Sequence, residues 1–278
     1  MSKAQVGLKI AALFLVCAAF FSCCSGGAKT ENTSILCGTT MIEALVKDLL
    51  PEAETSVMVP PGACPGSFDM KPSDARAVSS ARVFVLHPFQ SYLAEKAVKI
   101  NKRINVEVVK AKDLHLPGNY EQALLETEDI LLKYFPGRQT EFDNRRQLIV
   151  MAMEKEALKD FGLRKKISEK NIYAVSSSFH SAFAQYCGFK IAAEFAGPDS
   201  LNPEMLSGIL RAAREKKASI IISNMTGNHG ESADIINRQL RIKKIEMIVF
   251  PLEREGESGF FRVYRHNLRL ALEAAGVR

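Results

Sequence analysis

The chain alternates short β-prone runs with amphipathic helical stretches, and one long helical pattern divides this alternation into two halves. Strands separated by helices form βαβ units, in which neighbouring strands run parallel. Each half therefore predicts its own parallel sheet. The β-prone runs are residues 34–37, 55–59, 82–86 and 105–109 in the first half, and 172–176, 190–195, 218–223 and 246–250 in the second.

The dividing pattern spans residues 138–162 and contains neither proline nor internal glycine. Phe142, Ile149 and Met153 share one face of it, and charged residues cover the rest. At 1.5 Å per residue such a helix is about 37 Å long, enough to cross a small domain. We predict an α/β fold of two lobes, 33–137 and 165–278. Each has a four-stranded, mainly parallel sheet with flanking helices, and a spine helix over 138–164 joins them.

The N-terminus is typical of an export signal. Lys3 and Lys9 precede an apolar run over residues 10–21 that is too short to span a bilayer comfortably. The cysteine after this run makes it resemble a bacterial lipoprotein signal, which implies a lipid on the first mature cysteine. We predict a signal over 1–22, lipidation of Cys23 with Cys24 as the alternative, and a tether over 23–32. The mature protein is then exported and held by its lipid at the outer face of the cytoplasmic membrane, or lies in the periplasm.

Composition excludes several classes of function. The 278 residues are 47% hydrophobic and 24% charged, which is ordinary for a globular protein. The net charge of +6 comes without interleaved aromatic and basic residues, so we expect no nucleic-acid partner. No nucleophile elbow, phosphate loop or dinucleotide fingerprint occurs. We therefore expect a monomer that is not an enzyme and has no organic cofactor.

Loops at the predicted strand ends carry the candidate cleft. Open α/β sheets bind ligands beyond the carboxyl ends of their strands. A proline- and glycine-rich loop follows the second β-prone run and holds Cys64, Ser67 and Phe68, and Asn224 ends a run in the second half. We predict that these four residues line a cleft between the lobes.

Histidines also gather at these loops. Of 5 histidines, His87, His115 and His180 lie just beyond predicted strands, and His229 lies near another. Neutral imidazole is a common ligand of zinc and related metals. There is no HExxH or CxxC signature, and any single loop histidine is more often an ordinary polar residue. As a group they predict a divalent metal held by His180 with His87 or His115, with protons competing near neutral or mildly acidic pH.

Several motifs together resemble a known family, the solute-binding lipoproteins of zinc and manganese ABC importers. The resemblance covers about residues 35–270 and is carried by CGTTMIEALVKDLL, by VPPGACPGSFDMKPSDARAVSSARVFVLH and by SSSFHSAFAQYCGF. It implies a rigid helical spine, an ABC permease as partner and a metal ligand at His180. Two departures stand out. The family's first histidine ligand falls on Gly66, and its DPHxW motif has only Asp113-Leu114-His115 as an echo.

The sequence therefore predicts a membrane-anchored receptor that captures zinc or manganese for an ABC importer. Two alternatives remain open. The same fold could bind a metal chelate or another small solute, which the loss of the first family ligand and the apolar cleft residues favour. The chain could also be a surface adhesin or interaction protein with a degenerate metal site.

Overall fold

The computed structural model describes residues 34–66, 68–226, 229–252 and 258–278, and the chain from Ser34 to Arg278 forms one compact unit. The predicted signal, the tether and Cys23 lie outside the described residues, as does Ser67. Within the described part, no helix is both long enough and apolar enough to cross a bilayer. We call residues 34–137 the N-terminal lobe and residues 165–278 the C-terminal lobe.

The N-terminal lobe contains a parallel sheet of four strands in the order β2-β1-β3-β4, as the alternation predicted. Thr39 caps the first helix with its hydroxyl, which accepts a hydrogen bond from the Ile42 N–H. The elements are β1 (Ile35–Cys37), α2 (Thr40–Leu49), β2 (Thr55–Val57), α3 (Pro72–Ser80), β3 (Val83–Leu86), η1 (Pro88–Gln90), α4 (Ser91–Ile100), β4 (Asn105–Val108) and α5 (Pro117–Leu132).

The C-terminal lobe repeats this design with the strand order β6-β5-β7-β8, again all parallel. One strand was predicted at the wrong residues. Strand β8 covers Lys243–Met247, whereas the sequence predicted it at 246–250. The elements are β5 (Tyr173–Ser177), α7 (Ser181–Cys187), β6 (Lys190–Phe195), η3 (Pro198–Ser200), α8 (Pro203–Glu215), β7 (Ile220–Asn224), α9 (His229–Leu240), β8 and α10 (Gly259–Ala275).

The misplaced strand has a physical reason. The run that starts at Lys243 alternates charged residues with the buried Ile245 and Met247, which suits a strand at the edge of the sheet. The more apolar residues that follow leave the sheet. Phe250 among them lines a cavity between the lobes.

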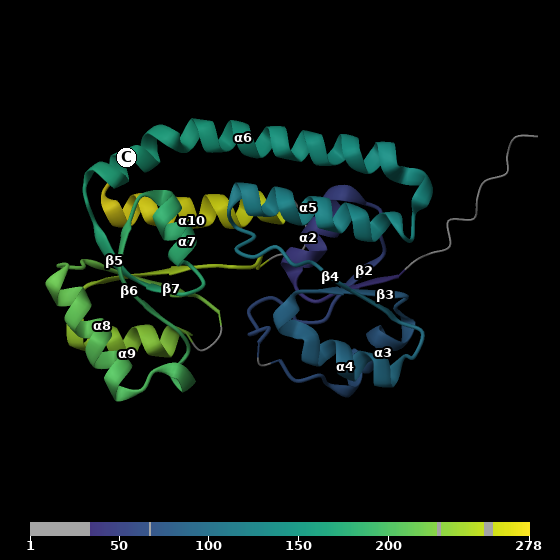
Figure 1. Cartoon of the computed structure of the whole chain (residues 1–278), viewed down its shortest axis with the longest axis horizontal. Coiled ribbons are helices and arrows are strands. Elements are labelled where there is room, and N and C mark those ends of the chain that lie inside the picture. The colour runs from purple at the N-terminus through teal and green to yellow at the C-terminus, as the bar shows by residue number, and fades with distance from the viewer. Residues whose placement is uncertain (1–33, 67, 227–228, 253–257) are drawn as a thin grey trace, which may run out of the picture. The chain divides into compact units, whose positions relative to one another are not determined.

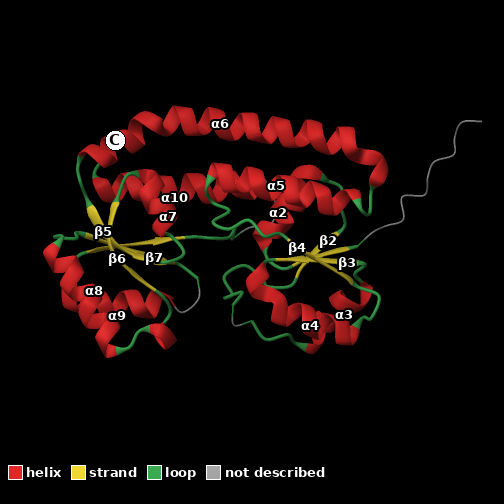
Figure 2. Ribbon diagram, viewed as in Figure 1, coloured by secondary structure: helices red, strands yellow, loops and turns green. Residues whose placement is uncertain are grey.

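A short turn, η2 (Pro136–Arg138), leads into the spine helix α6, which covers Gln139–Glu169 and so extends past the predicted end at 164. It contacts α2 and α5 from the N-terminal lobe and α7 and α10 from the C-terminal lobe. Figure 1 shows these helices on one side of the two sheets, with α3, α4, α8 and α9 on the other side. Figure 2 shows the same layers by secondary structure.

Strand side chains alternate between two environments. In β1, Ile35 and Cys37 point into the core beneath α6, whereas Leu36 points toward α3 and α4. In β7, Ile220 and Ile222 join that same core beneath α6, and Ile221 points toward α8 and α9. One continuous apolar core therefore underlies both sheets on the spine side, and each sheet has a separate core on its other face.

Candidate functional site

A cavity of about 430 Å³, which we call the chamber, lies between the two lobes. Loops that follow β2, β3, β4, β5, β7 and β8 supply its walls, because parallel strands end at the same edge of a sheet. Its lining residues are Cys64, Pro65, Gly66, His87, Pro88, Phe89, Ala111, Lys112, Asp113, Leu114, Phe179, Asn224, Thr226, Val249 and Phe250.

Two of the predicted cleft residues, Cys64 and Asn224, line this chamber. Phe68 does not. It packs against the core between the N-terminal sheet and helices α3 and α4, and its carbonyl accepts a hydrogen bond of 3.1 Å from the Tyr92 hydroxyl. Burial of the ring in this core outweighs exposure in the cleft.

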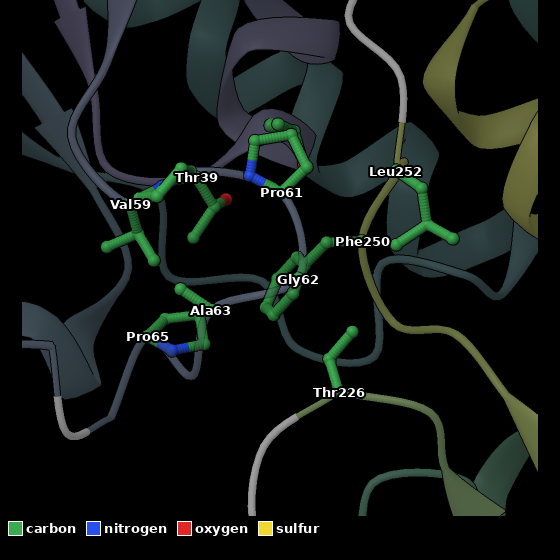
Figure 3. A pocket seen from close by; sticks show the side chains of 11 residues that line it. Thr39, Val59, Pro61, Gly62, Ala63, Pro65, Thr226, Phe250 and Leu252 are labelled. Carbon is green, nitrogen blue, oxygen red and sulfur yellow. The ribbon is translucent and has the colours of Figure 1, made fainter.

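The proline- and glycine-rich loop faces the C-terminal lobe. Figure 3 shows Pro61, Gly62 and Ala63 opposite Thr226 and Phe250, around a second, small cavity. That cavity measures about 10 Å³, room for about one water molecule. The loop therefore forms part of the junction between the lobes, at the place where the sequence predicted a cleft.

His180 sits at the start of α7, directly after β5. Its Nε2 lies 3.1 Å from Oδ1 of Asn224, and the amide nitrogen of Asn224 donates to the Thr226 carbonyl at 2.6 Å. Because the Asn224 amide is oriented by that second bond, its oxygen must accept from His180, which places the imidazole proton on Nε2. The other nitrogen, Nδ1, then carries a lone pair and has no hydrogen-bond partner among the described residues.

His115 is fully buried beside it, with ring centroids 5.9 Å apart. The ring also contacts the edge of Phe183 at 5.3 Å. Within the described part of the chain, neither nitrogen of His115 has a hydrogen-bond partner. Buried polar atoms are normally satisfied, and leaving them unpaired costs about 1–3 kcal/mol. The pair presents three buried nitrogens without a partner among the described residues, and in the neutral rings two of them, one from each histidine, carry the lone pair that transition metals bind.

His87 lies on the chamber wall and has a different environment. Its Nε2 is 3.0 Å from the Thr39 hydroxyl, and its ring stacks on Phe89 with centroids 5.0 Å apart. Among the residues that the structure describes, no three histidine, cysteine, aspartate or glutamate side chains are placed to hold one ion together. The structure thus brings His115 and His180 together, and the assignment of His180, His115 and His87 as ligands stays a prediction.

Burial controls the charge of these imidazoles. It lowers the pKa of His87 and of His180 to about 4, and that of His115 to about 3, where the neighbouring His180 adds to the effect. The rings are therefore neutral at mildly acidic pH. Proton competition for the folded protein moves to a lower pH than the near-neutral range expected from an ordinary imidazole.

The sequence placed His229 only near a strand end. In the structure its side chain contacts residues at the end of β5, which the sequence did not reveal. Its Nδ1 lies 2.9 Å from the Ser177 hydroxyl, and its ring centroid is 4.2 Å from that of Phe179. The contact joins the start of α9 to the end of β5 over a long sequence separation. Burial lowers the pKa of His229, so this ring is also held neutral.

Comparisons with known proteins agree with this architecture. The model of a family described as the periplasmic component A of a zinc-uptake complex (ZnuA) matches residues 35–274. A protein of Thermotoga maritima to which metal binding is ascribed is 24% identical over 248 residues, which cover 83% of this chain and 88% of that protein.

Solved structures show the same fold. The manganese-bound periplasmic metal binding protein of Candidatus Liberibacter asiaticus has a TM-score of 0.71 at 13% identity and covers 87% of this chain and 99% of its own. A crystal structure of ZnuA has a TM-score of 0.66 at 14% identity, with 88% and 98% covered. These similarities confirm the predicted fold class of two parallel four-stranded sheets with flanking helices.

Proposed function

The chain belongs to the ZnuA family of periplasmic zinc-uptake components, and from this premise we propose that it captures a divalent transition metal ion and delivers it to an ABC permease. The membership confirms the resemblance seen in the sequence. The family is one of uptake components, so the proposed role is that of a receptor that binds cargo without transforming it.

One observation carries the proposal. Two buried imidazoles from opposite lobes lie 5.9 Å apart and leave three nitrogens without a partner among the described residues. A metal ion coordinated by Nδ1 of His180 and by the unprotonated nitrogen of His115 takes up both available lone pairs and links the two lobes at the same time. The neutral charge state set by burial suits this role, because only an unprotonated nitrogen binds metal.

The donor chemistry favours zinc over manganese as the cargo. Imidazole nitrogen is a preferred ligand of zinc, whereas manganese is better matched by carboxylate, carbonyl and water oxygens. Asn224 supports the site indirectly, because its hydrogen bond to Nε2 orients the ring of His180. His87, the third predicted ligand, lies on the chamber wall and is not placed with the other two around one ion among the described residues, so the proposed site is the pair His115 and His180.

Metal titration of the mature chain tests this function. The chelator-stripped protein is titrated with zinc and with manganese, and bound metal is measured by elemental analysis. We expect zinc to bind at one equivalent and His180→Ala and His115→Ala each to weaken binding by at least about tenfold, because even the loss of a residue that only orients a ligand typically costs about 10–100-fold in metal affinity. His266→Ala on α10, which removes a histidine that does not line the chamber, is the matched control.

Two results of this titration would contradict the proposal. Wild-type protein that takes up neither metal contradicts the proposal. So does zinc binding that survives both substitutions unchanged, because the pair would then not be the site.

The proposal includes a lipid anchor on Cys23 that keeps a monomeric receptor near its permease. Mass spectrometry of the mature N-terminus checks the anchor. We expect a lipid-modified Cys23 and a soluble, unmodified product from Cys23→Ala, and an unmodified N-terminus in the wild type would rule out this part.

A further inference from the structure

The chamber is far larger than a bare ion requires. Its volume of about 430 Å³ falls within the range of about 300–1,000 Å³ that is typical of sites for small organic molecules. A coordinated ion occupies a space no wider than the first shell of donor atoms, about 2 Å from the metal. The volume of the chamber therefore matches a cargo that includes a small organic molecule.

The chamber walls present aromatic surface to solvent. Phe89 is 51% exposed and Phe179 is 43% exposed, and the two come from opposite lobes. Phe250 adds a third ring, whose centroid lies 5.8 Å from that of His87. A bare ion leaves these rings in water, whereas an apolar ligand covers them, which is the main driving force for binding in such sites.

One wall is flat. The rings of His87 and Phe89 are stacked with an interplanar angle of 10° and a centroid distance of 5.0 Å. Offset stacking of this kind extends readily to a further ring, because aromatic faces and edges carry complementary partial charges. The wall therefore favours a planar aromatic partner over an aliphatic one.

The chamber adjoins the histidine pair. Asn224 lines it and also holds Nε2 of His180, and Leu114 lines it next to His115 in the chain. Neither histidine lines the chamber itself, but each is separated from it by a single lining residue, His180 by Asn224 and His115 by its chain neighbour Leu114. The two features together place an apolar binding volume next to a metal-binding pair.

Resting on the proposed function, we propose that the cargo is a metal ion already bound to a planar aromatic chelator. The histidine pair supplies nitrogen donors to the metal, and the chamber holds the chelator's rings against Phe89 and Phe179. No bond other than metal coordination forms or breaks.

Calorimetric titration of the chelator-stripped mature chain tests the inference with three probes. These are zinc alone, the one-to-one zinc complex of 1,10-phenanthroline, and 1,10-phenanthroline alone. We expect the complex to bind at least about tenfold more tightly than zinc alone, as expected when aromatic contacts are added to coordination. Phenanthroline alone should bind more weakly than the complex.

Variants separate the chamber from the metal ligands. Phe89→Ala and Phe179→Ala should each remove most of the advantage of the complex, and Phe179→Ala should leave the affinity for zinc alone unchanged. Phe161→Ala is the matched control, because that ring is 60% exposed on the spine helix and does not line the chamber. His180→Ala should weaken binding of both zinc and its complex.

The outcomes distinguish this inference from the proposed function. A complex that binds no more tightly than zinc, or an advantage that survives both phenylalanine substitutions, overturns the inference and leaves metal capture intact. Wild-type protein that binds no zinc refutes metal capture. If phenanthroline alone then binds as tightly as its complex, and His180→Ala has no effect, the chelate inference is also overturned.

Discussion

At the scale of single residues, His115 is the most informative side chain. It is fully buried, contacts His180 and Phe183, and has no hydrogen-bond partner for either nitrogen among the described residues. A side chain kept only for stability would be apolar at this position, because an unsatisfied buried polar group lowers stability. The residue therefore lowers the stability of the metal-free protein, a cost that the proposed role as a metal ligand would explain.

This reasoning gives a prediction for His115→Leu. Without metal, the variant should be at least as stable as the wild type, by up to about 1–3 kcal/mol, because it removes unsatisfied polar atoms from an apolar site. It should also lose the stabilisation that zinc confers. Urea unfolding with and without a chelator measures both effects, and a metal-free variant that is clearly less stable than the wild type contradicts the argument.

The buried histidines also predict how stability depends on pH. Their pKa values of about 4, 3 and 4 for His87, His115 and His180 lie below the value of about 6.5 expected in the unfolded chain. Between pH 6.5 and 4 the unfolded chain binds more protons than the folded one, so stability falls as the pH falls. Each imidazole contributes roughly 1.4 kcal/mol per pH unit in that window.

Carboxyls whose pKa is raised by burial act in the opposite direction, namely Asp48 and, with smaller shifts, Asp113 and Asp160. Burial raises the pKa of Asp48 to about 6, although hydrogen bonds from Tyr120 and Ser258 partly counter this. Its contribution falls as the pH rises through that range, but three imidazoles outweigh it. Chemical denaturation of the metal-free protein at pH 7, 5.5 and 4.5 checks the net sign. Stability that is flat or rising toward low pH would be inconsistent with neutral buried imidazoles.

At the scale of elements, the contact between α10 and α2 joins the two lobes. Ser258, just before α10, donates to the Asp48 carboxylate at 2.8 Å, and the Thr40 hydroxyl donates to the Pro251 carbonyl at 2.7 Å. Gly259 permits the close approach. A Cβ atom there would lie 2.6 Å from the Cβ of Ala44, which belongs to α2. The last helix thus belongs to both lobes, although the sequence placed it in the C-terminal lobe alone.

Gly259→Ala should therefore destabilise the protein by about 1–3 kcal/mol, because the added methyl group would collide with the side chains of Ala44 and Pro251. Gly208→Ala within α8 is the control, since nothing lies within 4 Å of a Cβ at that position. That change should stabilise the protein by about 0.5–1 kcal/mol through helix propensity. Thermal unfolding of both variants compares them directly, and equal effects would argue against a tight contact between α10 and α2.

At the scale of the whole molecule, the core beneath α6 contains residues from both sheets, including Cys37, Ile222 and Phe260. Two sheets with fully separate cores would unfold independently, whereas a shared core couples them. The spine helix and α10 extend this shared packing. A metal ion held between His115 and His180 would add a link on the cleft side.

We therefore predict one cooperative unfolding transition for the metal-free protein and an upward shift of its midpoint with zinc. The shift follows mass action, about 2.7 kcal/mol when free zinc is 100 times the dissociation constant. Circular dichroism and the fluorescence of a reporter placed in each sheet should give coincident curves. Two separated transitions would show that the lobes unfold independently, and a midpoint unmoved by zinc would contradict metal capture.

Local pattern was enough to determine the architecture. Alternation of β-prone and helical runs predicted both parallel sheets, and the absence of proline from the long helical pattern predicted the spine, because each depends on neighbouring residues in the chain. Only the edge strand β8 was misplaced, where charged residues weaken the apolar signal.

The site depended on tertiary structure. The sequence predicted that loop histidines lie near the strand ends, but three of them looked equivalent there. Only folding places His115 beside His180, since this contact joins loops that follow separate strands in the two lobes. The depressed pKa values and the volume of the chamber likewise arise from burial and from the spacing of the lobes, which involve residues distant in sequence.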